Sequence, residues 1–302
     1  MMDLNQTIYA IMAADHGSFS RAALALAIDQ TSLARGIATL ERVLGVKLFI
    51  RSRTGVVPTI AGHAFLKEAR EIVRRADALT AAMREAGQGR AGGLTIGHNS
   101  PISAGNLHAT LFAWCDSNPH VEVDRIEAPR ETLIAGIARG EVDIAILSGQ
   151  IGYAGTRHAS LWSENVLVAM SEAHRLQERA TIEWADLREE NFLLTAREPG
   201  PDIRDMLLGR LSALGSTTHI RMLDTSRESL LGMIGRGPEI TVLNTAGAGA
   251  NYPGVIYREI QDRDGPTLVG YSAYWQPGND NPALRHFLKF VRQRYALTFN
   301  IG

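Results

Sequence analysis

One stretch of the chain, Ser18 to Gly62, constrains the fold more than any other. Its first half carries two runs of apolar residues at helical spacing, and each run follows residues that can cap a helix N-terminus. The first run follows Ser18 and Ser20 and predicts a short supporting helix. The second follows Asp29 and predicts another helix that ends at Gly45. Its apolar residues step by four, three and four positions along one face, through Leu33, Ile37, Leu40 and Leu44.

The opposite face of this second helix is polar. It carries hydrogen-bond donors and acceptors rather than packing groups, at Gln30, Thr31, Ser32, Arg35, Thr39 and Arg42. A helix with such a face can lie in the major groove of duplex DNA, where base edges present complementary groups. After the helix, two apolar segments flank a polar turn with a glycine at its tip, Arg51-Ser-Arg53-Thr-Gly55. We interpret this pattern as a hairpin, or wing, that carries two guanidinium groups.

In this order, these residues resemble the DNA-binding end of the LysR-type transcriptional regulators. The matching positions are Gly17-Ser18-Phe19, Ala22-Ala23, Leu26, Gln30, Leu33, Ile37, Leu40-Glu41, Leu44-Gly45, Leu48-Phe49, Arg51, Arg53, Thr59 and Ala61-Gly62. The resemblance implies a winged helix-turn-helix that binds double-stranded promoter DNA. The residues that it places at the DNA are Gln30, Thr31, Ser32, Arg35, Arg51 and Arg53.

Three positions depart from the family pattern, at Asp29, Ala34 and Gly36. They affect the detailed DNA contacts rather than the fold. Asp29 keeps a helix N-cap but brings a carboxylate toward phosphate. Glycine inside a helix costs roughly 1 kcal/mol relative to alanine. Gly36 is therefore expected to mark a close approach of the backbone, either to DNA or to the first of the two helices.

The net charge of −1 conceals an uneven distribution along the chain. Residues 1–89 hold 11 Lys and Arg against 8 Asp and Glu, which gives +3 and leaves −4 on the remainder. Phosphate binding scales with the number of phosphates neutralised, so one copy would hold DNA weakly and two copies on two half-sites would hold it better. A length of 302 residues also favours more than one domain.

The segment from Thr59 to Gln88 supplies a means of pairing two copies. It lacks proline and repeats apolar residues every seven positions, which is typical of a helix that pairs with another. The alternative is an amphipathic helix packed on its own domain, and the resemblance favours dimerisation, with tetramers common in the family. Four glycines between Gly87 and Gly93 then end the helix and mark a domain boundary. The seam consists of Phe65, Ala69, Ile72, Ala76, Leu79 and Met83.

Beyond the glycines, strands alternate with helices in two successive series, which predicts parallel sheets and two subdomains. Two segments between the series, 161–170 and 262–268, are expected to cross between the subdomains as a hinge. A strand at 267–274 and a helix at 282–295 end the chain. The first series has strands at 94–98, 121–126 and 142–147 and helices at 104–117 and 132–139. The second has strands at 192–194, 219–223 and 240–243 and helices at 202–214 and 227–236.

The resemblance to the LysR family continues here, in the segments Gly140 to Ala145, Trp184 to Leu187 and Gly232 to Ile240. It implies a two-subdomain effector domain similar to periplasmic solute-binding proteins, with a small molecule in the cleft between the subdomains. The expected fold is thus α/β, with a winged helix-turn-helix, a long linker helix and this effector domain. The expected bounds are 1–59, 60–89 and 90–302, with subdomain I at 90–163 and 266–302 and subdomain II at 164–265.

General physical principles also place a ligand in that cleft, since binding crevices of open α/β sheets lie beyond the carboxyl ends of strands. The strand ends offer hydroxyls, backbone donors and two cations, which favours a small anion, with a carboxylate as first candidate. For each hydroxyl the competing interpretation is helix capping, and for the two arginines a solvated position. The resemblance singles out Ser100 as a contact. The candidates are Ser100, Pro101, Ile102, Arg130, Ser148, Thr195, Arg197 and Thr225.

Catalytic and metal-binding patterns are missing from the sequence. It contains no GxSxG, HExxH or GxxxxGK pattern, and its nine histidines and Cys115 form no metal-ligand spacing. We expect no cofactor, no metal and no enzymatic activity; the alternative is a solute-binding or catalytic α/β protein with an appended helical dimerisation arm. Without a membrane-spanning apolar run or signal peptide, the expected location is cytoplasmic. Expected partners are promoter DNA, a small-molecule effector, one or three further copies and RNA polymerase.

Overall fold

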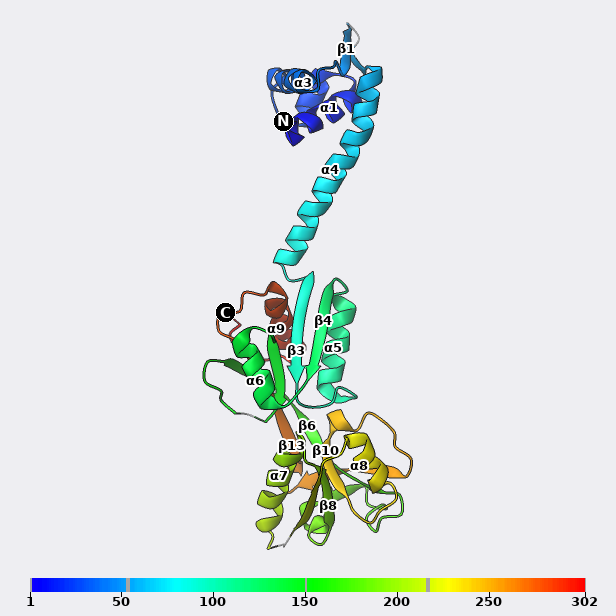
Figure 1. Cartoon of the computed structure of the whole chain (residues 1–302), viewed down its shortest axis with the longest axis vertical. Helices are drawn as coiled ribbons and strands as arrows, with labels where there is room; N and C mark the ends of the chain where they lie inside the picture. Colours follow the sequence, from blue (N-terminus) through cyan, green and yellow to red (C-terminus); the bar gives the residue numbers. More distant parts are fainter. Residues whose placement is uncertain (1, 53–54, 150, 216–217, 302) are drawn as a thin grey trace. The chain divides into compact units, whose positions relative to one another are not determined.

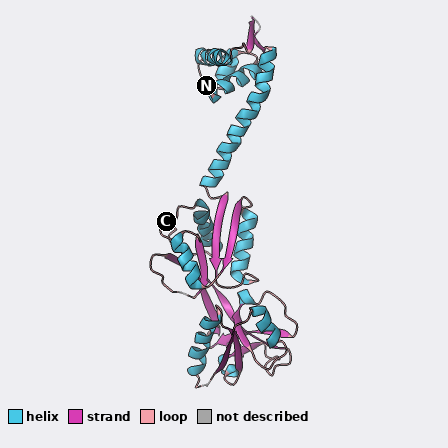
Figure 2. Cartoon of the chain, in the orientation of Figure 1, coloured by secondary structure: helices cyan, strands magenta, loops and turns pink. Residues whose placement is uncertain are grey.

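The computed structural model describes residues 2–52, 55–149, 151–215 and 218–301. It divides into two compact units, residues 1–85 and residues 86–302, which we call the N-terminal unit and the C-terminal unit. Figure 1 follows the chain through both. Figure 2 shows that helices dominate the first unit, whereas strands and helices together build the second.

The N-terminal unit consists of helices and a two-stranded hairpin. The predicted caps are present: the Ser18 side chain accepts a hydrogen bond from the Arg21 N–H, and the Asp29 side chain accepts one from the Ser32 N–H. The apolar face of the second predicted helix enters a core shared with Phe19. In chain order the elements are α1 (Leu4–His16), α2 (Phe19–Ala25), α3 (Gln30–Leu44), β1 (Phe49–Ser52), β2 (Gly55–Pro58) and α4 (Ile60–Gly87).

Three details of this unit differ from the sequence expectation. Helix α1 was not predicted, because its apolar residues do not follow a single face. Gly36 lies where α3 approaches α1, and a Cβ there would lie 2.7 Å from the Tyr9 ring. The close approach expected at Gly36 is therefore to α1, and not to DNA or to α2. Leu44 was expected on the buried face but is 36% exposed, because the last turn of α3 extends past the core.

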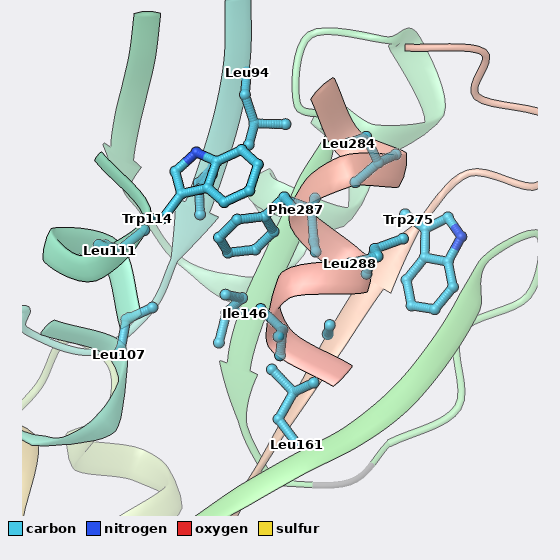
Figure 3. Close-up of a cluster of buried hydrophobic side chains, with 14 of the residues drawn as sticks. Leu94, Leu107, Leu111, Trp114, Ile146, Leu161, Trp275, Leu284, Phe287 and Leu288 are labelled. Carbon is cyan, nitrogen blue, oxygen red and sulfur yellow. The ribbon is translucent and has the colours of Figure 1, made fainter. Parts of the chain in front are cut away.

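Subdomain I of the C-terminal unit is a sheet covered by helices on both faces. Strand β3 pairs in parallel with β4 and β5, as predicted. Helices α5 and α9 cover one face; Figure 3 shows Trp114 of α5 near Phe287 of α9, with ring centroids 5.3 Å apart. Helix α6 packs on the other face through Leu133. The elements are β3 (Gly92–His98), α5 (Gly105–Ser117), β4 (Val121–Glu127), α6 (Arg130–Arg139), β5 (Ile144–Ser148), β13 (Leu268–Trp275) and α9 (Pro282–Arg294).

One long strand, β6 (Arg157–Ser171), joins the two subdomains. Its first part pairs with β13 and its second part with β10 (Thr241–Asn244) and β11 (Val255–Asp262), all antiparallel. The sheet is therefore mixed rather than parallel throughout, in the order β12 (Gly265–Pro266), β11, β6, β13, β5, β3, β4. The two expected crossing segments are the middle of β6 and the chain that leads into β13.

Subdomain II has its own core around Val168, Phe192 and Leu207. Strands β8 and β9 pair in parallel, and a parallel bridge from Phe192 to Ile240 places the chain entering β10 beside β8. The carboxyl ends of these strands therefore share one edge, as do those of β3, β4 and β5 in subdomain I. The remaining elements are β7 (Thr181–Glu183), η1 (Trp184–Leu187), β8 (Asn191–Thr195), α7 (Gly200–Ser212), β9 (His219–Leu223), α8 (Arg227–Ile234) and η2 (Thr245–Gly247).

Candidate functional site

The first candidate site is the outward face of α3. Its buried face holds Leu33, and its outward face leaves all four predicted contact residues exposed, Gln30, Thr31, Ser32 and Arg35. The Ser20 hydroxyl of α2 donates a hydrogen bond of 2.8 Å to the Gln30 side-chain oxygen, which orients the amide. A rigid, capped helix thus presents a row of donors and acceptors to solvent.

The hairpin of β1 and β2 stands beside this helix in the same unit. The Val56 N–H donates to the Gly17 carbonyl oxygen at 3.0 Å, and this contact holds the wing to the turn between α1 and α2. The exposed Arg51 guanidinium carbon lies 4.6 Å from the Phe19 ring centroid, a cation–π contact that limits where the charge can point. Arg53, the second predicted wing arginine, lies outside the described residues.

Glu41 fixes the wing to the end of α3, a role that the sequence reasoning missed. Its buried carboxylate accepts hydrogen bonds from the N–H groups of Leu48 and Phe49, at 2.9 and 3.3 Å, and pairs with Lys47 at 2.7 Å. Burial raises the pKa of Glu41, but these hydrogen bonds outweigh it and hold the pKa below its usual range. The available signal was a carboxylate directly after the core residue Leu40.

The predicted dimerisation seam lies along α4. At its start, Ala69 is buried and Phe65 half-buried against the core of the N-terminal unit. Farther along, Ile72, Leu79 and Met83 are 43%, 62% and 60% exposed. Half-buried Ala76 lies between Ile72 and Leu79. Large apolar side chains in an exposed row are typical of an interface, so this part of the helix favours pairing over packing on its own unit.

The second candidate site is the cleft between subdomains I and II. On the side of subdomain I, Asn99 follows β3 and lies next to Ser148 at the end of β5. The Ser148 N–H donates to the Asn99 side-chain oxygen at 3.0 Å, and the Asn99 amide donates to the Ser148 hydroxyl at 3.2 Å. The same amide donates to Glu198 of subdomain II, also at 3.2 Å. The two subdomains are therefore joined by direct hydrogen bonds.

Arg130 occupies the start of α6, two residues earlier than the predicted helix, and is buried. Its backbone N–H donates to Glu198 at 3.1 Å, and its guanidinium donates to Asp202 at 2.6 Å and to the Ser148 carbonyl oxygen at 2.9 Å. Burial raises the pKa of Asp202, while Arg130 opposes that shift. Two carboxylates from subdomain II thus bind Arg130, Asp202 at its guanidinium and Glu198 at its backbone N–H.

A hollow lies on the side of subdomain II; its cavity volume is about 30 Å³, enough for one or two waters, and the rest of it opens to solvent. Pro101 contributes to it from subdomain I, and Thr195 and Asn244 from the ends of β8 and β10. Arg227, the first residue of α8, also lines it. The sequence reasoning missed Arg227, although it directly follows the strand-end residues Thr225 and Ser226.

The other predicted cleft residues fall in different places. Ser100 is fully buried, and its hydroxyl lies near the Tyr271 hydroxyl. Ile102 packs at the edge of the subdomain I core. Arg197 is exposed and pairs with Asp224 at 3.2 Å. The structure thus brings Ser100, Pro101, Arg130, Ser148 and Thr195 toward the cleft, while Arg197 faces solvent and half-buried Thr225 is not among the residues lining the hollow.

The described residues carry neither a cluster of metal ligands nor a helix that could cross a membrane. The fold and the two sites together define a class: a regulator that joins a winged helix-turn-helix to a two-subdomain ligand-binding domain. Family models agree over nearly the whole chain. The model "Bacterial regulatory helix-turn-helix protein, lysR family" matches residues 4–63, and "LysR substrate binding domain" matches residues 87–296. The chain belongs to the LysR family of transcriptional regulators.

Individual relatives support the same assignment. The chain is 29% identical to the HTH-type transcriptional regulator XapR of Escherichia coli K12 over 265 residues, which cover 86% of this chain and 88% of that protein. Among solved structures, the LysR family regulator CbnR matches with a TM-score of 0.86 and 25% identity, over 96% of this chain and all of that one. Full-length CbnR in complex with its target DNA matches with a TM-score of 0.78 and 25% identity, over 97% of this chain and 99% of that one.

Proposed function

We propose that α3 of this regulator enters the major groove of promoter DNA. Gln30, Thr31, Ser32 and Arg35 then lie at base edges or the adjacent backbone, and Arg51 and Arg53 contact phosphate or the minor groove. The observation that carries the proposal is the exposed polar face of a capped helix whose other face is fixed in a core. The similarity to full-length CbnR, whose structure was solved with its target DNA, supports DNA binding by this chain.

Two copies pair through α4, by the exposed residues Ile72, Leu79 and Met83, together with the more buried seam residues Phe65, Ala69 and Ala76. Pairing places two N-terminal units on two half-sites and doubles a positive charge that is modest in one copy. The assembly is a homodimer or a homotetramer in the cytoplasm, without enzymatic activity, and RNA polymerase is its further partner.

A small-molecule effector in the cleft changes the regulatory output, through Ser100, Pro101, Ile102, Arg130, Ser148, Thr195, Arg197 and Thr225. It acts by population shift: the effector binds one arrangement of the subdomains more tightly than the other and so favours it. The hydrogen bonds from Asn99 and Arg130 to Glu198 belong to the arrangement described above, and a competing arrangement would break them.

Fluorescence anisotropy with duplex DNA from upstream of the chain's own gene tests the DNA-binding proposal. We expect saturable binding that weakens with salt and prefers this sequence over a scrambled duplex. Ser32→Ala should change the preferred base at one position, whereas Arg51→Ala and Arg53→Ala should weaken binding to all sequences and flatten the salt dependence. Equal, sequence-independent losses in all variants would contradict these roles. No binding by the wild type would favour a solute-binding protein with a dimerisation arm.

A further inference from the structure

The anion position that subdomain I offers is already occupied by the protein itself. Glu198 accepts hydrogen bonds from the Arg130 N–H at the start of α6 and from the Asn99 amide, at 3.1 and 3.2 Å. Asp202 pairs with the Arg130 guanidinium at 2.6 Å. A ligand carboxylate at this place would meet two carboxylates for one guanidinium, so like-charge repulsion would oppose it.

Arg227 is in the opposite situation. It is half-buried, and no hydrogen bond or ion pair of its guanidinium is found in the part of the chain that the structure describes. Glu127 and Glu228 act on it only through space. Burial lowers the pKa of Arg227, which means that neither water nor a counter-charge fully stabilises its cation. A guanidinium in this state is expected to attract an anion, and its planar fork of N–H groups fits a carboxylate.

The hollow beside Arg227 determines the rest of the ligand. Its two uncharged polar groups nearest the strand ends are already engaged, because Thr195 donates to the Arg197 carbonyl oxygen and the Asn244 amide donates to the Tyr271 hydroxyl. Among the described residues that line it, none is acidic and Arg227 alone is basic. The remaining lining is mainly apolar, with Leu194, Ile203, Leu230, Leu231, Val242 and Leu243.

We propose that the effector is a small monocarboxylate with an apolar body, and that Arg227 binds its carboxylate. This inference rests on the proposed role of the cleft as the effector site. The guanidinium supplies two parallel hydrogen bonds to the carboxylate, and the apolar body packs against the leucine-rich wall, where the ligand must widen a cavity of about 30 Å³. A dianion would leave one charge without a cation, and a neutral ligand would leave Arg227 uncompensated.

Thermal-shift and calorimetric titrations of the full chain test the proposal with named probes. Benzoate and 3-methylbutanoate represent the proposed class. Benzamide keeps the apolar body without the charge, succinate adds a second charge, and inorganic phosphate is an anion without an apolar body. We expect the two monocarboxylates to stabilise the chain at concentrations up to about 10 mM, and the other three to have little effect.

Substitutions of Arg227 test whether this residue binds the carboxylate of the ligand. Arg227→Met should weaken benzoate binding by at least about 10-fold, and Arg227→Lys by less, because it keeps the charge but loses the fork. Arg204→Gln is the matched control, since Arg204 is an exposed arginine of subdomain II that pairs with Asp205 and does not line the hollow. Circular dichroism and DNA anisotropy on the same samples show that each variant is folded.

Four results would overturn the proposal: no binding of either monocarboxylate, equal binding of benzamide, a preference for succinate or phosphate, or unchanged benzoate binding in Arg227→Met. Benzoate binding that instead increases in Glu198→Gln and disappears in Arg130→Met would move the anion to Arg130 and also overturn it. DNA binding that persists in any of these cases shows that the effector proposal has failed and the DNA-binding proposal has not.

Discussion

The two candidate sites differ in how exposed their arginines are and in whether those arginines have carboxylate partners. In the N-terminal unit, Arg35 and Arg51 are exposed, and hydrogen bonds such as those of Glu41 hold α3 and the wing together. In the cleft, Arg130 is buried and bound to Asp202, and Arg227 is the lining cation to which the described residues offer no such partner. The difference teaches that the exposed cations of the first site are available to the phosphate backbone of the proposed DNA, whereas the proposed effector must match the one cation of the cleft that lacks a partner among the described residues.

The largest effect on stability is expected in the cleft, at Arg130, and it tests the contrast between buried and exposed arginines. Arg130→Met leaves Glu198 and Asp202 facing each other, and we expect it to destabilise the C-terminal unit by about 2 kcal/mol, the lower end for breaking a buried pair because Asp202 is half exposed. All four tryptophans lie in residues 86–302, so urea unfolding followed by tryptophan fluorescence reports on this unit. Arg139→Met, which breaks the exposed pair with Glu141 in the same helix, is the control. Equal effects of the two would contradict the comparison.

The second-largest effect on stability is expected at Glu41, which joins α3 to the wing in the N-terminal unit. Glu41→Gln removes the charge that accepts from the Leu48 and Phe49 N–H groups, and we expect a loss of about 1.5 kcal/mol at neutral pH. Because the folded pKa lies below the ordinary value of 4.5, this stabilisation is complete above that value and is lost as pH falls through the folded pKa. Hydrogen exchange of peptides from α3 and the wing measures it. A wild-type advantage that persisted at lower pH would exclude the charged hydrogen bonds as its source.

A smaller effect is expected at Gly36. Alanine there would gain roughly 1 kcal/mol of helix propensity but would press on the Tyr9 ring, and we expect a net loss of about 1 kcal/mol. Hydrogen exchange in α1 and α3 is the readout. Adding Tyr9→Ala should remove the clash and restore the benefit of alanine at position 36, apart from the cost of the deletion itself. A stabilised single variant would show that α1 does not approach α3 this closely.

The smallest effect concerns an exposed ion pair. Arg70 of α4 pairs with Asp15 of α1, and both side chains are nearly half exposed. Solvent screens such pairs, so Arg70→Ala should change the stability of the N-terminal unit by less than about 0.5 kcal/mol. The same hydrogen-exchange measurement applies. A loss of stability as large as that of Glu41→Gln would mean that surface ion pairs stabilise the N-terminal unit as much as the buried carboxylate does.

Sequence alone predicted the exposed polar face of α3, the proposed DNA contact, because the information is local. The Asp29 cap, the apolar positions of α3 and its polar residues all lie within one short segment, and helical periodicity places them. Helix α1 was missed because its apolar residues lack one dominant face, and so the partner of Gly36 was missed as well.

The cleft could be predicted only as far as its strand ends. Ser100, Ser148 and Thr195 follow from the order of strands and helices, which the structure shares. The pairing of Arg130 with Asp202 and of Asn99 with Glu198 joins residues 72 and 99 positions apart, and no local pattern contains that information. The way the two subdomains close on each other decides which arginines gain a carboxylate partner. Arg227 gains none among the described residues.

The central claim is that two paired copies of this chain each insert the polar face of α3 into the major groove of duplex DNA. Hydroxyl-radical footprinting of the full-length protein on the DNA upstream of its own gene tests it most directly. We expect two protected patches whose centres lie about one helical turn, or a multiple of it, apart, and loss of both in Ser32→Ala combined with Arg51→Ala. The account is contradicted by an unprotected duplex at low salt, or by a single patch that the double variant leaves intact.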